Sequence, residues 1–185
     1  MTTIDLGVVE EPVSVADAKL WARIERDDED GLIAALIRAA REAIETATGL
    51  ALSQRSFRLV LDPVPPHGWI EATRHPLEAL GPVTAFAADG TPNLLDAEDV
   101  VIERSMGLEA FRLSPAAREA AANGIEIEFT AGFSAGKVPE NLLLALKTIV
   151  AASYETRAAV GPDMQPALMP DLAATLIAPY RRVRI

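Results

Sequence analysis

The chain has 185 residues, of which 27 are acidic and 17 are Lys or Arg, so its formal net charge is −10. This balance opposes tight binding to nucleic acid, because such binding depends on Lys and Arg displacing phosphate counterions. Cysteine is absent, which excludes disulfides and thiol catalysis. No apolar run approaches the roughly 20 residues of a membrane span, and the first residues lack the pattern of a secretion signal. We therefore expect a soluble protein that is synthesised in the cytoplasm.

Two helices are predicted near the start of the chain, at residues 14–24 and 28–48. Ser14 can cap the first helix, with Asp17 completing a variant of the capping box. Gly49 is suited to end the second helix. Apolar residues recur in the second helix at the three-and-four spacing of an amphipathic helix, at Ile33, Leu36, Ile37, Ala40, Ile44 and Ala47. The charged residues Arg38, Arg41, Glu42 and Glu45 fall mostly outside this stripe.

An acidic cluster, Asp27, Asp28, Glu29 and Asp30, precedes the second helix. A calcium-binding loop alternates its oxygen ligands and carries a glycine before a distal glutamate. Here the carboxylates are consecutive and Gly31 follows them. The cluster is better explained as negative charge that stabilises the start of a helix, so no metal site is predicted.

The segment from about residue 55 to residue 131 is predicted to be rich in β-strands. Alternation of apolar and polar residues or β-forming composition predicts strands near 56–61, 69–72, 82–87, 93–95, 100–103, 110–113 and 125–129. Asp89-Gly90 is a dipeptide typical of a tight hairpin turn. The alanine-rich stretch 116–122 predicts a short helix among the strands.

A third long helix is predicted at residues 139–158, with Pro139 at its start and one apolar face. A break at 161–166 and a shorter helix at about 170–178 follow. Helices, strands and helices in this order indicate an α+β fold, which we divide into a single domain at 1–160 and a C-terminal helix and arm at 161–185. The expected helical core comprises Ile33, Leu36, Ile37, Ile44, Leu142, Leu146 and Ile149.

No pattern of catalytic, cofactor-binding or metal-binding residues is found in the sequence. His67 and His75 lie in turn-like segments without the spacing of a zinc site, and we interpret both as solvated loop residues. There is no G-x-S-x-G elbow and no phosphate-binding loop. Trp21 and Trp69 are not surrounded by basic residues as a nucleic-acid stacking platform would be, so packing in a core or an interface is expected for both.

The end of the chain reverses the acidic character of the rest. Its six residues alternate basic with apolar or aromatic side chains, in the order Tyr180, Arg181, Arg182, Val183, Arg184 and Ile185. A frayed, solvated tail is one interpretation. The other is an arm that docks on a partner, because Tyr and Arg are among the residues most enriched at interface hot spots.

A family resemblance is carried by several segments of the chain, namely residues 12–19, 27–37, 40–49, 57–59, 129–133, 138–140 and 179–183. Together these segments resemble the head-tail connector, or adaptor, family of long-tailed phages and phage-derived gene transfer agents. The similarity lies in the order of the elements and in short stretches of sequence, involves no active-site motif and spans nearly the whole chain.

The resemblance implies a structural protein and no reaction or cofactor. It implies a helical bundle, made of the N-terminal helix pair and the long later helix, with a β-rich insertion and a C-terminal arm that contacts the portal. Copies of the chain would form a dodecameric ring under the portal of a virion or phage-like particle, extend the DNA channel and carry the stopper or tail proteins. An acidic channel would let DNA slide without specific binding.

Two other classes of protein stay open from the residues alone. One is a soluble regulatory binding module with a peptide-like tail, and the other, with less support, is a small-molecule enzyme of unknown type. Both predict a compact monomer or dimer, whereas a connector predicts a ring that assembles with its partners.

Overall fold

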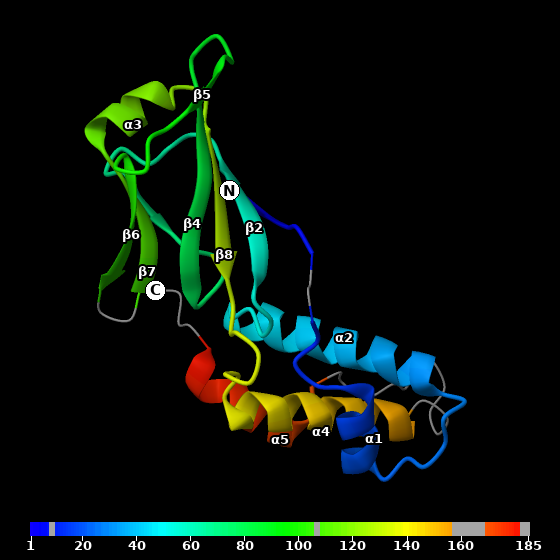
Figure 1. Cartoon of the computed structure of the whole chain (residues 1–185). Helices are drawn as coiled ribbons and strands as arrows, with labels where there is room; N and C mark the ends of the chain where they lie inside the picture. The colour runs from blue at the N-terminus through cyan, green and yellow to red at the C-terminus, as the bar shows by residue number, and fades with distance from the viewer. Residues whose placement is uncertain (8–9, 106–107, 157–168, 182–185) are drawn as a thin grey trace. The chain divides into compact units, whose positions relative to one another are not determined.

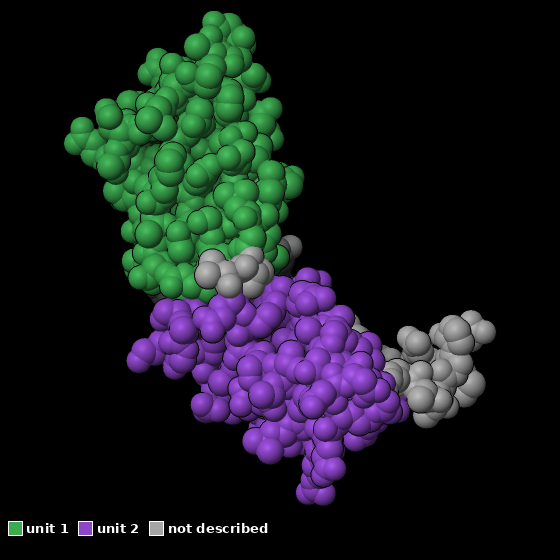
Figure 2. Space-filling view, turned by 45° about the vertical axis from the view of Figure 1, so that its right-hand side comes forward, with its two compact units in different colours: residues 1–9, 54–132 green, residues 10–53, 133–185 purple. Residues whose placement is uncertain are grey.

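The computed structural model describes residues 1–7, 10–105, 108–156 and 169–181 (Figure 1). It confirms the mixed α+β class. The chain divides into two compact units, coloured separately in Figure 2. Unit 1 comprises Met1–Val9 and Gln54–Gly132, and unit 2 comprises Glu10–Ser53 and Phe133–Ile185. The predicted boundary at residue 160 stays a prediction.

Unit 1 contains two antiparallel sheets. The five-stranded sheet has the order β1-β2-β8-β4-β5 and the three-stranded sheet has the order β3-β7-β6. The strands are β1 (Thr2–Asp5), β2 (Arg55–Leu61), β3 (Trp69–Glu71), β4 (Leu77–Phe86), β5 (Pro92–Leu94), β6 (Val100–Ser105), β7 (Leu108–Leu113) and β8 (Ile125–Ala131). The short helix α3 (Pro115–Ala120) lies between β7 and β8 in the chain. All the predicted strands and the alanine-rich helix are present, whereas β1 was not predicted.

The core of unit 1 is built from aromatic residues on facing strands. Phe57 on β2 stacks on its cross-strand partner Phe129 on β8, with ring centroids 5.5 Å apart. Phe111 on β7 packs against the same Phe129 ring at 5.2 Å, which joins the three-stranded sheet to the five-stranded one. All three rings are buried. The alternation that predicted β8 therefore reflects one face directed into this core, since aromatic cross-strand pairs stabilise sheets.

Unit 2 contains α1 (Val15–Ala22), α2 (Asp30–Thr48), α4 (Glu140–Thr156), α5 (Asp171–Ile177) and a short 3-10 turn, η2 (Ala178–Tyr180). Helices α1 and α2 pack on each other and on α4, and α5 packs on α4. These helices correspond to the predicted ones within a few residues, and residues 157–158 of the predicted third helix lie outside the described ranges. The Ser14 hydroxyl accepts a hydrogen bond from the Asp17 amide at 3.0 Å, and Gly49 ends α2 with a φ of 75°. Both predicted caps are confirmed.

The predicted core of unit 2 is confirmed except at one position. Leu36 is only partly buried and packs on the edge of the core. The other six predicted residues are at most 1% exposed, namely Ile33, Ile37, Ile44, Leu142, Leu146 and Ile149.

Two of the four charged residues noted in α2, Arg41 and Glu45, are buried. The side chains of Arg41 and Glu45 are 5% and 4% exposed and form an ion pair at 3.0 Å. Arg41 also pairs with Glu11 at 2.9 Å, and Glu45 accepts a hydrogen bond from the Leu52 amide at 2.8 Å. A buried charge is tolerated where its partners satisfy it. Glu45 lies one helical turn from Arg41, whereas Glu11 is remote in sequence, so the apolar spacing of α2 did not indicate this burial.

Candidate docking surfaces

The structure describes the first two residues of the predicted C-terminal arm. Tyr180 ends η2, is partly buried and packs against the core of unit 2, while Arg181 is exposed. The other four predicted docking residues, Arg182, Val183, Arg184 and Ile185, lie outside the described residues. The ring of Tyr180 therefore has a role within its own subunit, and the predicted contact with a partner stays a prediction.

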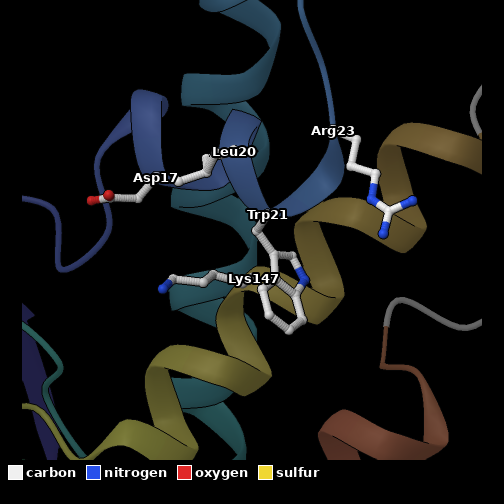
Figure 3. A pocket seen from close by; sticks show the side chains of 5 residues that line it. All are labelled: Asp17, Leu20, Trp21, Arg23 and Lys147. Atoms are coloured by element: carbon white, nitrogen blue, oxygen red, sulfur yellow. The ribbon is translucent and has the colours of Figure 1, made fainter.

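A hollow of about 480 Å³ lies beside α1 and is lined by Asp17, Leu20, Trp21, Arg23 and Lys147 (Figure 3). Asp17, Leu20 and Trp21 come from α1, Arg23 is its C-cap and Lys147 comes from α4. Leu20 is 81% exposed and Trp21 is 49% exposed. Arg23 has a φ of 55°, a left-handed conformation that is uncommon for residues other than glycine.

This surface was not predicted from the sequence. The two general expectations for Trp21 were a core or an interface, and its exposed indole excludes the core. The sequence showed that this short helix carries Leu20 and Trp21 as well as Ala18, but only the packing decided that Ala18 alone is buried. Apolar residues that a short helix leaves exposed form a candidate contact surface.

Three of the four carboxylates in the acidic cluster before α2 form ion pairs with basic side chains. Lys19 on α1 bridges Asp27 and Asp30, the latter at 2.7 Å, and Arg26 pairs with Asp28. The hydrogen bond from Arg26 holds the pKa of the Asp28 carboxyl below its ordinary value. Among the described residues, no group of three or more His, Asp or Glu side chains is arranged to hold a metal ion. The cluster thus ties α1 to the start of α2.

The two histidines differ, and the expectation of a solvated loop residue was wrong for His75. His67 is exposed and its ring accepts a hydrogen bond from the Trp69 amide at 3.1 Å. His75 is 4% exposed, and its Nδ1 lies 2.8 Å from Oε2 of Glu109. His75 is buried beside Glu109 of β7, which lies 34 positions further along the chain, and a local sequence pattern does not reveal such a contact.

Glu109 on β7 connects the two sheets of unit 1. Its Oε2 also accepts a hydrogen bond from the Leu77 amide of β4 at 2.8 Å, and its Oε1 accepts one from Arg104 Nε at 3.1 Å. Burial alone raises the pKa of the Glu109 carboxyl, but the hydrogen bonds from His75, Leu77 and Arg104 outweigh it. The net result is a pKa below the ordinary value of 4.5, so the carboxylate is the acceptor at neutral pH.

Replacing Glu109 by Gln should destabilise unit 1 at pH 7 by about 1–3 kcal/mol, because charged hydrogen bonds are lost. A carboxyl whose pKa is lowered in the folded state stabilises the fold above its unfolded pKa, and this contribution is lost as pH falls through the folded pKa. The difference between wild type and Glu109→Gln should therefore shrink below about pH 4.5.

Urea unfolding at several pH values, followed by Trp69 fluorescence in a Trp21→Phe background, measures this difference. Glu103→Gln is the matched control, since Glu103 is on the neighbouring strand β6 and its side chain is 39% exposed. A difference that stays constant from pH 7 to pH 3 would contradict the assigned role of the ionised Glu109.

Both the sequence and the fold of this chain match known proteins. Residues 12–75 match the family model described as phage gp6-like head-tail connector protein. The fold matches a chain in the virion of a native gene transfer agent particle, with 26% identity and a TM-score of 0.82 over 100% of this chain and 97% of that one. It also matches a chain in the neck of the native particle computed with C12 symmetry, with 25% identity, a TM-score of 0.78 and the same coverage.

A third match, at 24% identity and a TM-score of 0.79, is to a chain from the neck of an empty particle of this kind and supports the fold alone. No curated protein matches in a sequence comparison. Within the described ranges, none of the helices has the length and apolar character that a membrane crossing requires. The resemblance to the phage head-tail connector family that the sequence indicated is confirmed.

Proposed function

We propose that this chain is a structural head-tail connector in the neck of a phage or phage-like particle. The observation that carries the proposal is the full-length match to chains of gene transfer agent virions and necks, together with the connector family match at residues 12–75. In this role the chain has no catalytic turnover. Its copies form a ring of twelve under the portal, which extends the DNA channel and offers the attachment surface for stopper or tail proteins.

Charge supports the channel role. The chain carries a net charge of −10, and carboxylates near a channel repel the phosphates of DNA, which reduces friction during passage. DNA therefore passes through the ring without sequence-specific binding. The helical-bundle layout of the family is part of the same proposal, and it agrees with the joint packing of α1, α2, α4 and α5.

The arm at residues 180–185 is proposed as the contact with the portal. Arg181 and the two following arginine positions in this segment can pair with carboxylates or backbone carbonyls, which form strong charge-assisted hydrogen bonds. The apolar positions 183 and 185 can fill pockets between these polar contacts. The alternative classes, a regulatory module or an enzyme, have no comparable observation in their favour.

Electron microscopy of the purified chain mixed with its portal tests the proposal. We expect a ring of symmetry-related copies on one face of the portal, with density that accommodates the two units of this fold. A chain that remains monomeric or dimeric in the presence of portal, and that is absent from the necks of purified particles, would contradict the connector function.

A further inference from the structure

The surface beside Trp21 combines features of a protein contact. Leu20 has the largest exposed fraction among the large apolar side chains that the structure describes, at 81%, and Trp21 is 49% exposed beside the hollow. Single exposed apolar residues are common on protein surfaces. Here two adjacent ones line a concave site, and Trp is among the side chains most enriched at interface hot spots.

The charge of this surface indicates an acidic occupant. Lys147 and Arg23 contribute two positive charges against the single carboxylate of Asp17 (Figure 3). Within the described residues, neither Lys147 nor Arg23 takes part in an ion pair, although the chain as a whole has ten more acidic than basic residues. A second copy of this acidic chain therefore offers the complementary charge.

The proposed ring requires two different surfaces on each copy, because a closed ring is built from head-to-tail contacts. Helix α5 provides a candidate for the second surface. Its residues Ala173 and Ile177 are buried in the core of unit 2, while Leu172 is 56% exposed and Asp171 beside it is exposed. The apolar side chain of Leu172 complements the apolar residues of the hollow, and the carboxylate of Asp171 complements its positive charges.

These two surfaces lie on different parts of unit 2. Helix α1 packs on α2 and α4, and α5 packs on α4, so the hollow lies at α1 with Lys147 of α4, and the second surface lies on α5. Resting on the proposed ring function, we infer that the hollow beside Trp21 of one copy receives Leu172 of the adjacent copy, with Asp171 directed towards Lys147. The same contact repeated around the ring closes it.

Cysteine cross-linking tests this contact directly, because the native chain has no cysteine. We would introduce Leu20→Cys and Leu172→Cys, separately and together, into assembled particles or into rings formed on the portal. Both positions are exposed, so the variants should fold. Oxidation, or treatment with a short bismaleimide, should convert the double variant into a ladder of covalent oligomers on a non-reducing gel and leave each single variant monomeric.

The matched control combines Leu20→Cys with Leu94→Cys, because Leu94 is 74% exposed but lies in unit 1. This pair should give no ladder. A dimer from Leu20→Cys alone would mean that two copies meet through the same surface, which overturns the inference. Rings that are visible by microscopy but yield no ladder from the double variant also overturn it and leave the connector function intact, whereas absence of rings in every variant counts against that function itself.

A charge exchange provides a second test. Lys147→Glu should reduce ring formation, and adding Asp171→Lys in the same chain should restore much of it because the pair is re-formed with opposite signs. If Lys147→Glu leaves the ring unchanged and instead removes salt-dependent binding of duplex DNA, the surface is a nucleic-acid site and the inference is wrong.

Discussion

A chain that ends at Tyr180 should fold like the full-length subunit and fail to join heads to tails. The truncation removes Arg181 and the four residues after it, which carry most of the proposed portal contact. It keeps Tyr180, whose side chain packs against the core of unit 2, and the buried α5 residues Ala173 and Ile177. Truncation after Tyr180 therefore tests attachment without disturbing the folded core.

The loss of attachment should be abrupt. Each short segment uses part of its binding energy to become ordered on its partner, so a single contact is weak. Repetition around a ring raises the avidity of the whole assembly, and removing every copy of the segment removes that avidity at once. Particles made with the truncated chain should contain filled heads without tails, while circular dichroism of the purified subunit stays unchanged.

Tyr180→Ala is the informative companion variant. Because Tyr180 packs on its own subunit, this substitution should lower the free energy of unfolding, an effect that the truncation after Tyr180 avoids. Wild-type numbers of tailed particles from the truncated chain would show that the arm is dispensable and that the portal contact lies elsewhere.

Replacing Leu146 by Ala should lower the free energy of unfolding of unit 2 by about 2–5 kcal/mol. Leu146 is 0% exposed in the middle of α4, so truncation leaves a cavity as well as removing apolar surface from the core. Leu36→Ala should cost less, because Leu36 is only partly buried at the edge of the same core.

Urea unfolding followed by the helical circular dichroism signal measures both values. Leu20→Ala is the control, since Leu20 is 81% exposed and surface substitutions usually change stability by no more than about 0.5 kcal/mol. Equal shifts of the midpoint for Leu146→Ala and Leu20→Ala would show that α4 does not hold the core together.

The secondary structure was predictable because its signals are local. The apolar stripes of α2 and α4, the cap at Ser14, the helix end at Gly49 and the Asp89-Gly90 turn each depend on residues within a few positions of one another. The hairpin of β4 and β5 around this turn is present. Strand β1 was missed because its four residues acquire a partner only when they pair with β2, which lies about fifty positions further along the chain.

The sequence by itself determined the α+β class, the order of the elements apart from β1, and six of the seven positions expected in the helical core. Its family resemblance indicated a structural role. Only the tertiary structure decided which polar residues are buried and which apolar residues are exposed. Arg41 is buried because Glu11 and Glu45 satisfy its charge, and His75 is buried against Glu109 of a distant strand. Trp21 is exposed because α1 packs on its neighbours through Ala18. Burial depends on contacts between remote segments, and spacing along one segment does not encode them.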